Sequence, residues 1–129
     1  KQDVDVSFIE LDHPGGAVGY SFVKDNKKVV ILLDNEFQEA HLGRLLEFCK
    51  DGDLLVWDGM FTKEELLNKR GWGHSSIEQA EKFTELSDVK RTVICHHAPY
   101  RSDADIDLLS SRISSNRVSF GREKMSFYI

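Results

Sequence analysis

Five histidine and aspartate side chains stand where strands are expected to end or a helix to begin. Four of them follow short apolar runs and one lies in a glycine-rich stretch: they are His13, Asp34, Asp58 and His96, and then His74. In open α/β sheets, ligands bind outside the carboxyl ends of the strands, so side chains at matching strand ends converge on one edge. Imidazole and carboxylate groups suit zinc, manganese and iron. The spacing therefore indicates a metal site at the edge of a sheet.

Each of these residues also has a purely structural interpretation. A single histidine after a strand is more often a turn residue, and Asp34 could simply cap the helix that follows it. His96 and His97 point to opposite faces if their strand continues through them, so only one is expected to be a direct ligand. The recurrence of such residues at several strand ends favours the metal site.

The aromatic and basic residues outside this group give a weaker signal. Trp57 and Trp72 are predicted to be packing residues rather than binding platforms. Four arginines could form a patch that faces phosphate or simply a scattered solvated surface; they are Arg101, Arg112, Arg117 and Arg122.

The elements that must position the site residues follow from the apolar pattern. Strands are predicted over residues 3–11, 17–24, 27–33, 53–57 and 91–95, and a closing hairpin over 118–120 and 125–129. In the first strand, Val4, Val6 and Phe8 are expected to share the buried face of a half-buried strand, and Ile9 is a further candidate for it. Residues 29–33 form a continuous aliphatic run, which is typical of a strand covered on both faces.

Two helices are predicted between the strands. One follows Asp34 and ends near Gly52, and the other begins at Ser75, which forms a capping box with Glu78. Residues 102–116 are rich in serine and aspartate. Strands that alternate with helices predict an α/β fold in α+β layers, with a mixed sheet and helices on one face.

Composition bounds the class of protein. A chain of 129 residues is one ordinary domain, and a net charge of -5 provides no overall basic field for nucleic acid or membranes. Cys49 and Cys95 lie in apolar surroundings, which favours a reduced, cytoplasmic protein. No signal peptide or membrane-spanning run is evident. Because the chain begins with Lys1, we expect a fragment of a longer protein or a processed product.

Five short motifs in this order resemble the C-terminal half of metallo-β-lactamase-fold hydrolases. They are HPGGAVGYSF, VVILLDNE, DLLVWDGMF, GWGHSS and VICHHAPY, which together cover the chain from His13 to its last strand. The branch they are most similar to is the phosphodiesterase branch, which includes tRNA 3′-processing endonucleases and cyclic phosphodiesterases. The resemblance implies half of a four-layered αββα sandwich, with residues 1–129 as a single unit.

The resemblance also implies roles for individual residues. His13 matches a ligand of the first metal, Asp34 the carboxylate that bridges both metals, and His96 a ligand of the second. His74 matches a catalytic histidine beside the metals, and Asp58 the acid that orients it. Two divalent ions are implied, with zinc first and manganese or iron as alternatives. The implied reaction is phosphodiester hydrolysis by a hydroxide that bridges the metals, with Asp34, Asp58 and His74 as catalytic residues.

One departure from the family's pattern is large. The main signature, His-x-His-x-Asp-His, is absent, because it belongs to the N-terminal half of the fold. Three ligands are too few for two metals, so the chain alone is expected to be an incomplete enzyme. The expected partners are the missing N-terminal half, in the same chain or another, and a phosphodiester small molecule or the 3′ region of a nucleic acid. A homodimer, or a half-domain that acts only in binding or assembly, is the alternative.

Overall fold

The computed structural model describes residues 3–129. In chain order its elements are β1 (Asp5–Leu11), β2 (Ala17–Lys24), β3 (Lys27–Leu32), the 3-10 helix η1 (Glu39–His41), α1 (Leu42–Cys49), β4 (Leu54–Asp58), α2 (Lys63–Leu66), α3 (Ile77–Leu86), β5 (Thr92–Cys95), α4 (Asp103–Ser110) and β6 (Val118–Phe120). The described helices include none that is long and apolar enough to cross a membrane.

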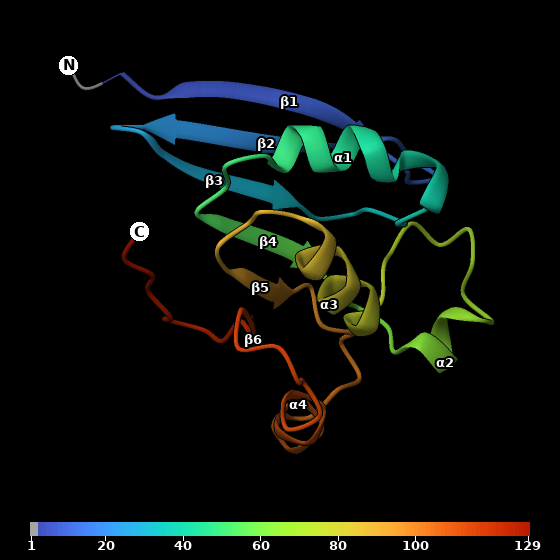
Figure 1. The fold of residues 1–129 in the computed structure, drawn as a ribbon. Coiled ribbons are helices and arrows are strands. Elements are labelled where there is room, and N and C mark those ends of the chain that lie inside the picture. Colours follow the sequence, from blue (N-terminus) through green and yellow to red (C-terminus); the bar gives the residue numbers. More distant parts are fainter. Residues whose placement is uncertain (1–2) are drawn as a thin grey trace.

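The strands form one mixed sheet in the order β1-β2-β3-β4-β5-β6, as Figure 1 shows. β1, β2 and β3 are antiparallel neighbours, and Asp25 and Asn26 make the two-residue turn between β2 and β3 with φ values of 50° and 62°. The pairs β3–β4, β4–β5 and β5–β6 are parallel. The carboxyl ends of β3, β4 and β5 therefore lie at the same edge, and the prediction of a mixed sheet is confirmed.

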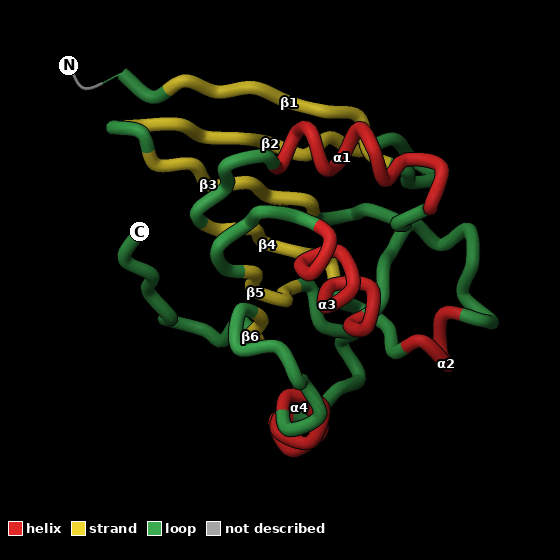
Figure 2. The backbone as a smooth tube through the Cα atoms, viewed as in Figure 1, coloured by secondary structure: helices red, strands yellow, loops and turns green. Residues whose placement is uncertain are grey.

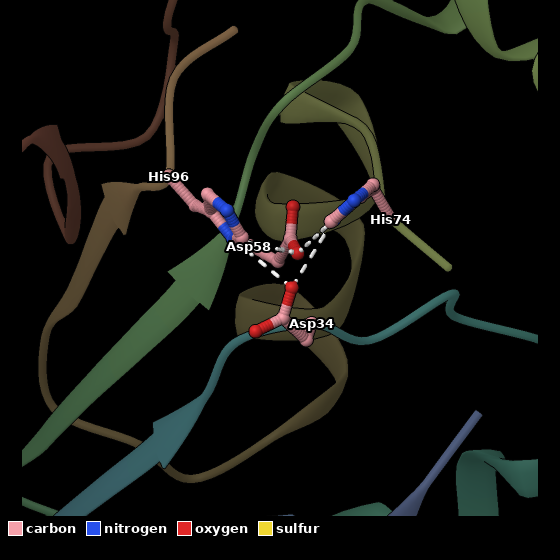
Figure 3. A group of neighbouring side chains, drawn as sticks. All are labelled: Asp34, Asp58, His74 and His96. Atoms are coloured by element: carbon pink, nitrogen blue, oxygen red, sulfur yellow. Dashed lines mark hydrogen bonds and ion pairs between the residues drawn. The ribbon is translucent and has the colours of Figure 1, made fainter. Parts of the chain in front are cut away.

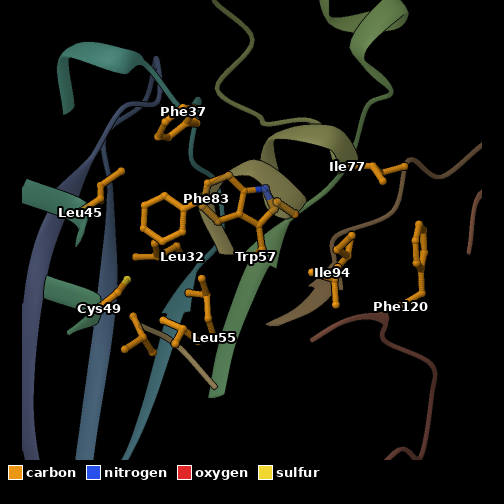
Figure 4. Close-up of a cluster of buried hydrophobic side chains, with 14 of the residues drawn as sticks. Leu32, Phe37, Leu45, Cys49, Leu55, Trp57, Ile77, Phe83, Ile94 and Phe120 are labelled. Atoms are coloured by element: carbon orange, nitrogen blue, oxygen red, sulfur yellow. The ribbon is translucent and has the colours of Figure 1, made fainter. Parts of the chain in front are cut away.

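The main core lies between the sheet and the helices α1 and α3, which cover one face (Figure 1). Figure 4 shows Phe83 of α3 against Leu32, Leu55 and Trp57 of the central strands. The rings of Trp57 and Phe83 have centroids 5.1 Å apart, and both side chains are buried. Each large side chain buried in this way contributes roughly 1.5–3 kcal/mol. This packing fixes the strands whose ends carry the site.

The other face of the sheet is less covered. Register places Phe8, Tyr20 and Ile31 side by side on it, and Phe8 is 69% exposed. The expectation that Val4, Val6 and Phe8 form the buried face is wrong, because all three are exposed and Leu11 and the partly buried Ile9, on the opposite face of β1, pack against the core. Each face of this strand carries apolar residues, so the pattern alone could not choose between them.

The second half of the chain departs from prediction in three places. Ser76 rather than Ser75 caps α3, with Gln79 as its partner in the capping box. Residues 102–116 contain α4, which Ser102 caps and which packs beside β6 (Figure 2). Residues 125–129 form no strand, and β6 pairs in parallel with β5 instead of closing a hairpin. The hairpin prediction is therefore wrong.

Candidate metal centre

Four side chains from separate segments meet at the carboxyl edge of the parallel strands (Figure 3). Asp34 follows β3, Asp58 ends β4, His96 follows β5, and His74 comes from the loop before α3. One nitrogen or carboxylate oxygen from each lies within 4.8 Å of those of the other three. The structure therefore brings together four of the five predicted residues, and His13 lies beside this group, with Nε2 3.7 Å from Asp34 Oδ1.

Asp58 is the buried centre of this group, with no exposed surface. Its Oδ2 lies 2.8 Å from His74 Nδ1 and 3.3 Å from His96 Nδ1. The backbone N–H of Met60 donates to Oδ1 at 3.2 Å, and that of Asn35 to Oδ2 at 3.4 Å. A carboxylate favours the proton on the facing nitrogen of a neutral imidazole, so His74 keeps its proton on Nδ1 and leaves Nε2 for other chemistry.

Asp34 lies at the exposed side of the group. Its Oδ1 is 3.9 Å from both His74 Nδ1 and His96 Nδ1. The same oxygen lies 3.7 Å from Nε2 of His13, which comes from the turn between β1 and β2. Asp34 thus lies within 4 Å of His13, His74 and His96, and its side chain is 49% exposed. A carboxylate in this place is accessible from solvent and surrounded by imidazoles.

Backbone strain coincides with two of these positions. Asp34 and His96, which follow the parallel strands β3 and β5 on either side of β4, have φ values of 54° and 59°. For residues other than glycine this left-handed conformation costs roughly 1–2 kcal/mol, less for aspartate. Strain of this kind is found most often at functional sites, where the surrounding structure enforces it. The tight turn after each strand keeps both side chains at the sheet edge.

The donor set fits a divalent metal. His96 Nδ1 is buried and forms no hydrogen bond within the described residues, although it lies near Asp58. Buried polar atoms are normally satisfied, and an imidazole nitrogen left in this way is a natural metal ligand. Two carboxylates with two or three imidazoles form a set that zinc accepts, as do manganese and iron.

The loop that carries His74 is tied to the segment after β3. The carboxylate of Glu36 accepts hydrogen bonds from the backbone N–H groups of Gly71 and Gly73, at 2.8–3.0 Å. The Ser75 hydroxyl donates to the Asn35 carbonyl and accepts from the Phe37 N–H. This use of Ser75 explains why Ser76 caps the helix. Bonds to an ionised carboxylate are stronger than neutral ones, so the loop is held firmly.

Close packing links this loop to His13. Gly73 has φ +88°, and a Cβ built on it would lie 2.2 Å from His13 Cδ2. The rings of His13 and His74 meet edge to face, with centroids 5.6 Å apart. Glu36 and Gly73 therefore help to position two histidines. The only sign of this in the sequence is weak: a glycine pair around Trp72 precedes His74, and an acid follows Asp34 by two residues.

Other residues singled out by sequence lie outside the cluster. His97 donates from Nε2 to the Gly121 carbonyl at 3.1 Å and stacks on Phe120, and its burial lowers its pKa. Trp57 is a core residue as predicted, but Trp72 is 57% exposed, so the packing prediction is wrong for it.

The arginines mostly bind partners within the protein, which favours a scattered surface over a phosphate patch. Arg101 contacts Met60 and Glu65, and Arg122 pairs with Asp107. Arg117 donates to two backbone carbonyls.

Comparison with known proteins identifies the fold. No protein-family model matches the chain, and no curated protein matches it in sequence. Among solved structures, the short form of human tRNase Z superposes with a TM-score of 0.70 at 19% identity, over 97% of this chain and 43% of that one. The metallo-β-lactamase fold protein YhfI from Bacillus subtilis gives a TM-score of 0.73 at 15% identity, over 91% of this chain and 46% of that one.

A diphosphatase from the PhnP family gives a TM-score of 0.68 at 14% identity, over 100% of this chain and 47% of that one. The chain therefore spans slightly less than half the length of these proteins. The resemblance to metallo-β-lactamase-fold hydrolases is confirmed at the level of the fold, as is the prediction of half of such a fold.

Proposed function

We propose that this chain, with about half of a metallo-β-lactamase fold, is the C-terminal part of a metal-dependent hydrolase that cleaves phosphodiesters. The observation that carries the proposal is the meeting of Asp34, Asp58, His74 and His96 within 4.8 Å at the carboxyl edge of the sheet. The similar solved structures include a tRNase Z and a diphosphatase, which favours phosphate ester chemistry. Both cysteines are free, which fits a reducing compartment such as the cytoplasm.

The residues divide into ligands and proton-handling groups. His13, Asp34 and His96 would hold two divalent ions, with Asp34 shared between them because it approaches all three histidines. When bound, such ions supply a water of lowered pKa and positive charge beside the phosphate. Three protein ligands are few for two ions, so the proposal requires further ligands from an N-terminal half.

His74 acts on the leaving group in this proposal. Asp58 holds its Nδ1 at 2.8 Å, which orients the ring and leaves Nε2 to exchange a proton with the substrate. The proton on Nε2 is then available for the departing alkoxide, and general acid catalysis of this kind contributes typically 10²–10⁴-fold. The ring of Phe61 lies edge-on to His74 with centroids 6.0 Å apart, which limits its rotation.

The N-terminal half is proposed to cover the open face of the sheet. Three exposed apolar side chains lie next to one another on this face: Val6, Phe8 and Tyr20. An exposed apolar face of this kind is typical of an interaction surface. The same face supports a second candidate function, in which the chain is a half-domain that only docks or dimerises and the clustered residues do no chemistry.

Hydrolysis of bis-p-nitrophenyl phosphate by the full protein with zinc or manganese tests the first function. We expect turnover that falls at least about 100-fold in His74→Ala with metal content unchanged. His41→Ala is the control, because His41 lies outside the cluster. An absence of turnover, or equal activity in both variants, would reject the assignment. Purified protein that self-associates and binds no stoichiometric metal would favour the assembly module.

A further inference from the structure

The loop before His74 presents an unusual aromatic residue. Trp72 is 57% exposed and stands two positions from His74. Most tryptophans in folded proteins are largely buried, since the indole is the largest apolar side chain. Leu67, near the start of the same loop, is also exposed. Exposure of Trp72 next to a candidate catalytic residue therefore indicates a role in ligand binding rather than in packing within the protein.

Trp72 is fixed in place from both sides. Glu36 binds the N–H groups of Gly71 and Gly73, its two neighbours in the chain. The backbone N–H of Trp72 also donates to the Lys69 carbonyl at 3.2 Å, which closes a turn. An exposed ring on a backbone held at three points has lost much of its freedom before any ligand arrives, which reduces the entropic cost of binding.

Positive charge accompanies the ring. The ammonium of Lys69 lies 3.8 Å from the ring centroid of Trp72, in a cation–π contact. Arg70 follows it in sequence, is exposed, and lines a cavity of about 480 Å³ together with Glu36 and Leu66. A rigid aromatic face flanked by Lys and Arg is the combination that binds single-stranded nucleic acid, where bases stack and phosphates pair with cations.

We propose that the turn Lys69–Trp72 is a base-stacking site that binds a nucleotide next to the scissile phosphodiester. The base stacks on the face of Trp72 opposite Lys69, while the exposed Arg70 contacts the adjoining phosphate. The proposal rests on the function proposed above and narrows its substrate to single-stranded RNA or DNA. It makes Trp72 a determinant of specificity, because a phosphodiester without a base gains nothing from the ring.

The test is binding of a single-stranded octanucleotide to the full protein in EDTA, where no hydrolysis interferes. Quenching of tryptophan fluorescence reports the contact, and anisotropy of a labelled oligonucleotide gives the affinity. We expect saturable quenching that is lost in Trp72→Leu, with affinity about 5- to 100-fold weaker. Trp72→Phe should recover most of the affinity because it keeps an aromatic face.

Two controls distinguish binding of the base from binding of the phosphates. Leu67→Ala alters another exposed apolar side chain of the same loop and should bind the octanucleotide normally. An octamer of abasic sites should bind wild type and Trp72→Leu equally. If Trp72→Leu and wild type bind the octanucleotide that carries its bases with equal affinity, the proposal of a stacking site at Trp72 is wrong. Turnover of bis-p-nitrophenyl phosphate is measured separately, so failure of this site and failure of the proposed hydrolase remain distinguishable.

Discussion

Replacement of Gly73 by alanine should disrupt the contact between the two histidine-bearing loops. A Cβ at this position would lie 2.2 Å from Cδ2 of His13, 2.8 Å from its Cγ and 2.8 Å from Cδ of Pro14. The proline ring is rigid, and the His13 ring already meets His74 edge to face. The added methyl group can therefore be accommodated only if one of the loops moves.

The expected magnitude has two parts. The φ of +88° at Gly73 imposes roughly 1–2 kcal/mol on any residue with a Cβ. Overpacking against His13 adds roughly 1–3 kcal/mol. The free energy of unfolding should thus fall by about 2–5 kcal/mol. Where the loop moves instead, His13 leaves Asp34 and metal affinity falls on the order of 10- to 100-fold.

Gly71 provides a matched control. Its φ is +81°, its N–H also donates to Glu36, and a Cβ there would meet no atom within 4 Å. Gly71→Ala should therefore show the backbone penalty alone, roughly 1–2 kcal/mol, with metal affinity unchanged. Urea denaturation measures the stability of both variants, and competition with a chromophoric chelator measures zinc affinity. Equal stability and equal zinc affinity in the two variants would refute the contact between Gly73 and His13.

Three further predictions concern carboxylates. Asp58→Asn should lower bis-p-nitrophenyl phosphate hydrolysis about 10²- to 10⁴-fold while metal content stays unchanged, because the amide no longer holds His74 in its productive form. Glu36→Gln should reduce the free energy of unfolding by about 1–3 kcal/mol in urea and speed hydrogen exchange at the N–H groups of Gly71 and Gly73, which lose a charged acceptor. Asp53 has its pKa lowered to about 2, first by the hydrogen bond from Lys90 and then by the bond from the backbone N–H of Lys28. The stabilisation from Asp53 is therefore present above a pH of about 4 and is lost as pH falls toward about 2. The free energy of unfolding measured in urea should accordingly be lower at pH 3 than at pH 6.

Each of these predictions has a result that would contradict it. Loss of metal together with activity in the Asp58 variant would make Asp58 a ligand rather than a positioning residue. Glu39→Gln is the control for Glu36, since the Glu39 carboxylate pairs with Lys82 at the surface and its loss should change stability by less than about 1 kcal/mol. In Asp53→Asn, the loss in free energy of unfolding between pH 6 and pH 3 should be smaller by about 1 kcal/mol. This value is small because the ammonium of Lys90 is solvated. The same loss in the variant and in wild type would exclude a stabilising role for Asp53.

The parallel strands and the convergence of the site could be predicted because they depend on local pattern. The aliphatic runs before Asp34, Asp58 and His96 are continuous, and consecutive parallel strands bring their carboxyl ends to one edge. The roles of these residues in metal binding and catalysis stay predictions.

The contacts that position the loop could not be predicted in the same way. The bonds from Glu36 to Gly71 and Gly73 join residues about 35 positions apart, and no local propensity encodes such a pairing. The predicted capping box lies one residue before the observed one for the same reason, since Ser75 and Ser76 are equivalent as caps until Asn35 binds one of them. The sequence does not indicate α4, because only Ile106 and Leu109 of its eight residues are buried, which leaves a weak apolar period.

The central claim is that the edge of the sheet holds divalent metal, and anomalous diffraction from crystals of the full protein grown with zinc tests it most directly. The account predicts two anomalous peaks at bonding distance from Asp34, one also at bonding distance from His13 and the other from His96, and both weaken in Asp34→Ala. A peak elsewhere, or none at this edge in crystals that hold zinc at other sites, would contradict it.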